Sequence, residues 1–254
     1  PPPPLFFFTH IPAYPMLRSL VGSEMCIRDR LDNLEDYLTI GAIVSKHIEG
    51  NTELDFINIS EDFEFGKFYL GLLLQQYSFN EYKDQDATMP KVNSEKFQGL
   101  EEIEIIAKSV MWVRDQINRP SLDKSPAQFV ESVDKLISGL EISIHDKTWL
   151  EKNNFGGVLG VAKGSEREPY LLEGIYNPSA EFQLSLIGKG VMFDSGGLSL
   201  KSPSGMDTMK TDMSGAATVW GLMHIVSEMK LDIGVRVLTH LLENMQSVLT
   251  LIHI

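Results

Sequence analysis

The segment spanning residues 188–212, which reads GKGVMFDSGGLSLKSPSGMDTMKTD, constrains the fold of this chain more than any other. It directly follows the apolar run of residues 182–187, so a strand is expected to end in a glycine-rich loop. In open α/β sheets, ligands bind beyond the carboxyl ends of strands, and glycines let the backbone approach a bound group closely. The segment therefore predicts a ligand site at one end of a sheet.

Helical and strand patterns alternate along the rest of the chain, which is typical of a layered α/β architecture. The best-marked helix starts at Ser125, where Pro126 and Gln128 complete a capping box, and Gly139 is placed to end it. The polar residues 80–98 are interpreted as a loop or linker that ends a first unit. Further helices are predicted at residues 60–77, 107–117 and 214–229, and strands at 40–44, 100–106, 140–144, 157–162, 170–175, 182–187 and 233–242.

Residues 1–30 are expected to be a non-native or disordered leader. They begin with four prolines and a short apolar run that no charged segment precedes, which makes a poor signal peptide. Residues 18–30 resemble translated adapter sequence, and residues 248–254 are interpreted as a similar scar. The leader contains Cys26, the single cysteine of the chain, so an internal disulfide framework is excluded.

The net charge and the short apolar runs argue against two classes of partner. A net charge of -13 does not suit nucleic-acid binding, which requires a basic surface, and solvated acidic faces account for it. No apolar run approaches the roughly 18 residues that a membrane-spanning helix needs. The chain is therefore expected to bind neither nucleic acid nor a membrane and to be cytoplasmic.

Two lysines and two aspartates are distributed through residues 188–212. Lys189 and Asp194 are five residues apart, Asp194 and Lys201 seven, and Lys201 and Asp212 eleven. Any one of them alone would be interpreted as a turn residue or a solvated charge. Together, around glycine turns, they have the composition that a hydrolytic metal site needs.

Other kinds of site lack their sequence signatures. The phosphate-loop pattern G-x-x-x-x-G-K-[ST] and the dinucleotide pattern G-x-G-x-x-G are absent from the segment. Ser195 has no G-x-S-x-G elbow around it and is interpreted as a turn hydroxyl. The six histidines include no H-E-x-x-H pair, which disfavours a histidine-ligated zinc site.

The full spaced set closely resembles the active-site signature of the leucyl aminopeptidase family, the two-metal cytosol aminopeptidases of peptidase family M17. Similar stretches at residues 70–82, 113–118 and 243–245 extend the resemblance over about residues 31–245. It implies an α/β fold of two domains. Residues 31–100 would form part of a small N-terminal α/β domain, and residues 101–254 the N-terminal half of an αβα catalytic domain with a mixed central sheet.

The resemblance also implies a role for each charged residue. Asp194 would bridge two divalent metal ions, either zinc or manganese, with magnesium as a further candidate. Asp212 would ligate the second of these ions, and Lys189 would be its nitrogen ligand once the amine has lost its proton. Lys201 would stay protonated, bind the substrate and stabilise charge on the scissile carbonyl, while Met209 would line the pocket for the N-terminal side chain.

The second ligand cluster of that family, an Asp-x-Glu-x-Arg segment, does not occur among the residues that follow Asp212. The chain is therefore expected to be an incomplete form of the enzyme, either active or inactive. The resemblance implies that the enzyme acts on peptides and assembles as a hexamer. Two alternatives stay open. One is a non-catalytic scaffold or binding protein that keeps the aminopeptidase fold, and the other is nucleotide binding by the N-terminal unit.

Overall fold

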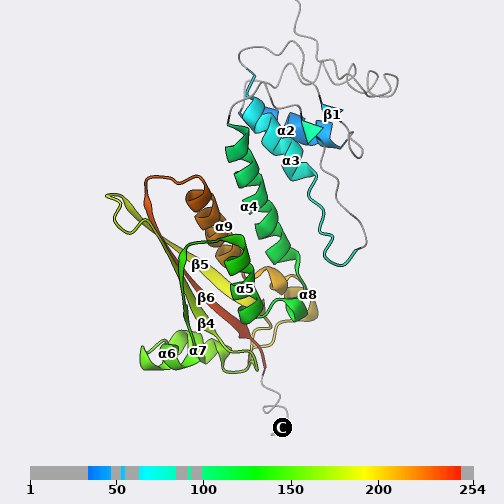
Figure 1. Cartoon of the computed structure of the whole chain (residues 1–254). Coiled ribbons are helices and arrows are strands. Elements are labelled where there is room, and N and C mark those ends of the chain that lie inside the picture. Colours follow the sequence, from blue (N-terminus) through cyan, green and yellow to red (C-terminus); the bar gives the residue numbers. More distant parts are fainter. Residues whose placement is uncertain (1–33, 47–52, 55–62, 84–90, 93–98, 247–254) are drawn as a thin grey trace, which may run out of the picture. The chain divides into compact units, whose positions relative to one another are not determined.

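The computed structural model describes residues 34–46, 53–54, 63–83, 91–92 and 99–246 (Figure 1). The chain divides into two compact units, residues 1–108 and 109–254, which are described separately. Within the described residues, no helix is long and apolar enough to cross a membrane. The domain boundary predicted near residue 100 stays a prediction, since residues 93–98 lie outside the described part of the chain.

The first unit is built around two helices, α2 (Leu34–Ser45) and α3 (Phe65–Gln75). Their backbones come so close that a Cβ atom on Gly41 would lie 1.9 Å from the Phe68 carbonyl oxygen, and one on Gly71 1.9 Å from that of Leu38. Glycine is therefore required at both positions. Two short strands, β1 (Glu53–Leu54) and β2 (Lys91–Val92), pair in parallel, and the first half of α4 (Leu100–Asn118) completes the unit.

The second unit contains a mixed four-stranded sheet, as predicted. Its order is β3 (Glu141–His145), β4 (Tyr170–Tyr176), β6 (Gly234–Asn244) and β5 (Gln183–Asp194). The pairs β3–β4 and β4–β6 are antiparallel, whereas β5 and β6 run parallel and are connected through α9 (Ser214–Glu228). Parallel neighbours need such a crossover, and a helix is its usual form.

Helices α9 and α5 (Pro126–Leu136) lie beside the sheet (Figure 1). Their apolar side chains and those of the sheet form one buried cluster. Met192 of β5, Val237 of β6 and Trp220 of α9 are fully buried, and the Trp220 indole N–H donates to Thr239 Oγ1 at 3.0 Å. The smaller elements of the unit are η1 (Ser121–Asp123), α6 (Lys147–Lys152), α7 (Gly156–Ala162), α8 (Pro203–Met206) and η2 (Met209–Thr211). Of these, α7 lies against β6.

The predicted start of α5 is confirmed in detail. The Gln128 backbone N–H donates to Ser125 Oγ at 3.1 Å, and the Ser125 backbone N–H donates to Gln128 Oε1 at 2.8 Å. The helix ends at Leu136, and Gly139 adopts a φ of 79° in the turn toward β3. Gly139 does not itself end the helix, because the C-cap residue Ile137 is already extended, with a φ of -117°. Its positive φ suits glycine in the turn instead.

Three predicted strands are wrong. Residues 40–44 lie in α2, residues 100–106 form the first part of α4, and residues 157–162 lie in α7. Each is a short apolar run, and such a run fits a buried helix as well as a strand. The helix predicted over residues 60–77 is α3, which is shorter, and the proposed cap at Ser60 lies outside the described residues.

Candidate metal centre

A β-bulge near the end of β5 determines which way its charged side chains face. Between Val191 and Asp194 this strand contains one residue more than the facing stretch of β6. Lys189 and Asp194 would point to opposite faces of an unbroken strand, because they are five residues apart. Here they pair with His240 and Asn244, which are four residues apart and share one face. The bulge therefore brings Lys189 and Asp194 to the same face of the sheet.

The turn after β5 is fixed by Asn244, the last residue of β6. The Asn244 carbonyl oxygen accepts hydrogen bonds from the Ser195 backbone N–H at 2.9 Å and from Ser195 Oγ at 2.7 Å. Ser195 is thus a turn hydroxyl, as predicted. Gly197 has a φ of 62°, and a Cβ atom there would lie 2.6 Å from Asn244 Oδ1.

Asp194 and Lys201 form the first of two ion pairs. Lys201 Nζ lies 2.5 Å from Asp194 Oδ2 and 2.8 Å from Met209 Sδ. The other carboxylate oxygen, Oδ1, accepts hydrogen bonds from Asn244 Nδ2 at 2.7 Å and from the Gly196 backbone N–H at 3.0 Å. Burial alone raises the pKa of the Asp194 carboxyl, but these donors outweigh burial and hold the pKa below its ordinary value.

Lys189 and Asp212 form the second ion pair, with Lys189 Nζ 2.9 Å from Asp212 Oδ2. The carboxylate oxygen is buried and makes no hydrogen bond, so the two charges are in contact without the alignment of a hydrogen bond. A buried acceptor in this condition is costly unless a cation neutralises it. Asp212 lies at the end of η2, directly before Met213 and the start of α9.

The two ion pairs both involve β5 and both reach the η2 segment, which packs on this strand. Lys189 of β5 pairs with Asp212 at the end of η2, whereas Asp194 of β5 pairs with Lys201 of the following loop, which contacts Met209 of η2. The structure therefore brings all the predicted site residues to one region. Carboxylates are ligands that zinc and manganese accept, and Asp212 Oδ2 is a buried oxygen that lies in contact with a cationic side chain but accepts no hydrogen bond. In the part of the chain that is described, no group of three or more His, Cys, Asp or Glu side chains could hold a metal ion.

Two residues at the end of β6 were missed from the sequence as individual residues. Asn244 positions both Asp194 and the turn, and its neighbour Glu243 is buried and accepts from Arg167 Nη1 at 2.7 Å. Both belong to the stretch 243–245, whose resemblance to the aminopeptidases was the only signal available. Neither hydrogen bond could be inferred from spacing, because each joins residues about 50 or more positions apart.

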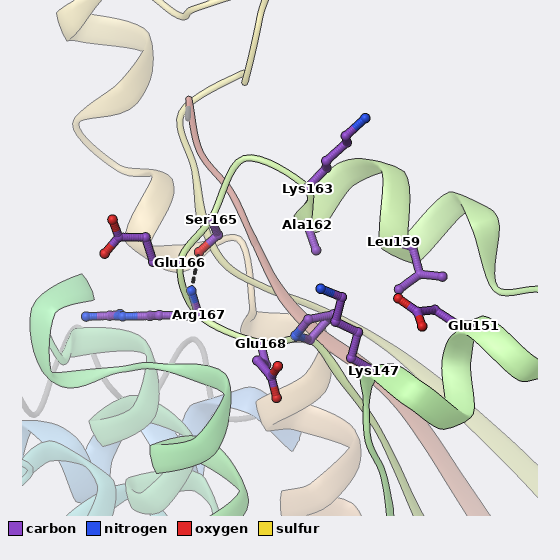
Figure 2. A pocket seen from close by; sticks show the side chains of 10 residues that line it. Lys147, Glu151, Leu159, Ala162, Lys163, Ser165, Glu166, Arg167 and Glu168 are labelled. Carbon is purple, nitrogen blue, oxygen red and sulfur yellow. Dashed lines mark hydrogen bonds between the residues drawn. The ribbon is translucent and has the colours of Figure 1, made fainter. Parts of the chain in front are cut away.

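Two cavities lie near these elements. One, of about 390 Å³, is lined by charged side chains that include Lys147, Lys163 and Arg167, and Figure 2 shows them from close by. None of the predicted site residues lines it. The other, of about 380 Å³, is lined mainly by apolar residues of α7, β5 and β6 and includes Lys189 and His240. Burial lowers the pKa of the His240 imidazole there, which favours its neutral form.

Two solved structures superpose on this chain over most of its length. A cytosol aminopeptidase from Coxiella burnetii, solved as a crystal structure, superposes with a TM-score of 0.74 at 28% identity, over 85% of this chain and 48% of its own. The bottromycin maturation enzyme BotP, solved in complex with Mn, superposes with a TM-score of 0.76 at 27% identity, over 84% of this chain and 48% of its own.

The sequence relatives agree. A protein of Leifsonia xyli subsp. xyli, described as a probable cytosol aminopeptidase, is 38% identical over 199 residues, which are 73% of this chain and 40% of the relative. The chain thus spans about two fifths of the length of that relative. Residues 111–250 match the family model described as "Cytosol aminopeptidase family, catalytic domain". The chain belongs to the cytosol aminopeptidase family.

Proposed function

We propose that the protein to which this chain belongs is a metal-dependent aminopeptidase that removes leucine-like residues from the N-termini of peptides. The observation that carries the proposal is the pairing of Lys189 with Asp212, between β5 and η2, beside the pairing of Asp194 with Lys201, between β5 and the loop that follows it. Membership of the cytosol aminopeptidase family supports the reaction class. The same resemblance is the basis for expecting a cytoplasmic hexamer.

Asp194, Asp212 and Lys189 are the residues that would hold divalent metal ions. A pair of such ions supplies a water nucleophile that is ionised near neutral pH. Manganese is the first candidate, because the similar BotP enzyme was solved in complex with Mn. The buried Asp212 oxygen that lacks a hydrogen bond supports a cation at this position. Lys189 would contribute a neutral amine, so metal binding would release its proton.

Lys201 and Met209 would act on the substrate. The Lys201 ammonium would donate to the scissile carbonyl oxygen and stabilise the negative charge that develops there. It lies 2.8 Å from Met209 Sδ, so the methionine side chain borders the space in front of it. An apolar, flexible thioether at that place suits a leucine-like side chain better than a charged one.

The alternative is a non-catalytic scaffold or binding protein that keeps this fold. A scaffold needs no metal, whereas the proposed enzyme does. Metal binding therefore separates the two functions even where the present chain is not active.

The test is calorimetric titration of the chain with MnCl₂, beside the variants Asp212→Asn and Asp207→Asn. The proposed function predicts saturable binding that Asp212→Asn weakens at least tenfold. Asp207→Asn is the matched control, since Asp207 is exposed at the end of α8 and forms no part of the site. No saturable binding by the parent chain, or equal binding by Asp212→Asn, favours the scaffold.

A companion assay addresses the reaction itself. The complete protein is expected to release leucine from leucyl-peptides when Mn²⁺ or Zn²⁺ is supplied and to lose that activity in a chelator. Activity that persists in the chelator contradicts the proposed function.

A further inference from the structure

Lys124 is a fully buried lysine that the proposed reaction does not use. It follows η1, precedes the cap of α5, and exposes 1% of its surface. A buried ammonium is costly unless its donors are satisfied. Lys124 Nζ donates to three backbone carbonyl oxygens, those of Gln116 at 3.0 Å, Ile117 at 3.3 Å and Lys210 at 2.6 Å. All three N–H groups therefore have an acceptor.

Two of these acceptors explain why a cation is stable at this place. Gln116 and Ile117 lie in the last turn of α4, which ends at Asn118. The final carbonyl groups of a helix have no partner within the helix, and they form the negative end of its dipole. The ammonium of Lys124 satisfies two of them and lies at that negative end.

The third acceptor ties the end of α4 to the candidate metal centre. Lys210 is the middle residue of η2, between Met209 and the residue that precedes Asp212. A second lysine joins the same two elements, since Lys210 Nζ donates to the Asn118 carbonyl oxygen at 3.1 Å. Lys124, from the segment after η1, and Lys210, from η2 itself, thus both connect η2 to the end of α4.

The hydrogen bonds that η2 makes within its own segment each span only three residues. It is a single 3₁₀ turn without a buried residue, in which the backbone N–H groups of Thr211 and Asp212 donate to Thr208 O and Met209 O. The hydroxyls of Thr211 and Ser214 donate to Thr208 O and Thr211 O. Short 3₁₀ turns have poor hydrogen-bond geometry and little intrinsic stability. Long-range contacts must therefore hold η2 in place.

We infer that Lys124 is a positioning residue. Its buried ammonium fixes η2 against the end of α4, and this places the Asp212 carboxylate opposite Lys189 and Met209 opposite Lys201. The inference rests on the proposed function in one respect, namely that Asp212 binds a metal ion. The position of η2 itself can be measured without metal.

The first experiment is hydrogen exchange of the metal-free chain. Lys124→Met keeps an unbranched side chain, one atom shorter, but removes its donors, and it is expected to increase exchange of the backbone N–H groups of residues 208–213 at least tenfold. The matched control is Leu150→Ala, because Leu150 of α6 is also fully buried but lies outside this network. The control is expected to lower the melting temperature without changing exchange in residues 208–213.

The second experiment is calorimetric titration with MnCl₂ at a temperature where every variant is folded. Lys124→Met is expected to weaken binding about tenfold with unchanged stoichiometry, and Leu150→Ala to leave it unchanged. Should Lys124→Met not fold, Lys124→Gln retains N–H donors on a chain one atom shorter and is expected to give smaller changes in the same direction.

The two readouts separate the two ideas. Equal exchange in the folded Lys124 variant and in Leu150→Ala overturns the positioning role, whatever the metal does. Selective exchange in residues 208–213, together with no Mn²⁺ binding by the parent chain, leaves the positioning role standing and contradicts the proposed function.

Discussion

At the scale of single residues, the two site aspartates differ in what they contact. Asp194 accepts hydrogen bonds from Lys201, Asn244 and the Gly196 backbone, whereas Asp212 Oδ2 is buried without one. The first carboxylate therefore contributes to folding before any metal binds. The second carboxylate contributes little to folding. A residue that does not contribute to stability is typical of a functional site.

This contrast predicts unequal effects of the same substitution on stability. In a chelator, Asp194→Asn is expected to lower the free energy of unfolding by about 1–3 kcal/mol, because it removes charge-assisted hydrogen bonds. Asp212→Asn is expected to change it by less than about 1 kcal/mol, because its partner Lys189 is largely exposed. Urea denaturation of both variants measures the difference, and an equal loss in the two contradicts the contrast.

Lys124 predicts a dependence of stability on pH. Burial, followed by the nearby charges of Lys210 and Arg119, lowers its pKa from 10.5 to about 8. Between these two values the unfolded chain binds more protons than the folded chain, so this residue makes the free energy of unfolding rise with pH. The rise is absent below pH 8 and amounts to about 3 kcal/mol at most by pH 10.5.

The measurement is urea denaturation of the parent chain and of Lys124→Met at pH 7, 8, 9 and 10. Above pH 8, the free energy of unfolding of the parent chain is expected to rise relative to that of Lys124→Met. Parallel pH profiles for the two proteins would show that the ammonium is not destabilised by its burial.

At the scale of elements, the end of β5 depends on the end of β6. The bulge turns Asp194 to the face of Lys189, and Asn244 holds it there through a hydrogen bond of 2.7 Å. The Ser195 bonds to Asn244 use the backbone carbonyl, so they survive a change of the Asn244 side chain. Substitutions at this position therefore act on Asp194 selectively.

Asn244→Ala is expected to cost about 1–2 kcal/mol of stability through the lost hydrogen bond. Asn244→Asp is expected to cost more at pH 7, because a second carboxylate would face Asp194. Protonation of one of the two relieves this repulsion, so the aspartate variant should regain stability relative to the alanine variant between pH 6 and pH 4. Thermal unfolding of both variants in a chelator measures this. A difference in stability between them that stays the same from pH 6 to pH 4 would contradict the prediction.

The sequence allowed prediction of the elements that carry strong local signals. The capping box at Ser125 and the long apolar strand 233–242 both appear in the structure, as α5 and β6. The segments 40–44, 100–106 and 157–162 were wrong because packing, not local pattern, decides the state of a short apolar run. The bulge and the buried Lys124 had no sequence signal, since one depends on pairing with β6 and the other on backbone carbonyls.

At the scale of the whole molecule, the chain spans about half of each solved relative described above, and β5 lies at the edge of the described sheet. This strand is twelve residues long, and apolar side chains next to it and within it are exposed, Phe182 at 61%, Leu184 at 39% and Ile187 at 70%. A long apolar edge strand offers unpaired N–H and C=O groups and is a site for pairing with another chain. The net charge of -13 opposes such association, but it acts over the whole surface, not at this edge.

We therefore expect the isolated chain to self-associate through β5 at micromolar concentration, and more strongly as salt screens the net charge. Ile187→Lys introduces a charge at the edge and is expected to shift the chain toward monomer in sedimentation velocity experiments. Leu198→Lys is the matched control, because Leu198 is 86% exposed but lies in the turn after the strand. Equal effects of the two substitutions would mean that the net charge of the chain governs association. A parent chain that is monomeric in high salt would contradict association through β5.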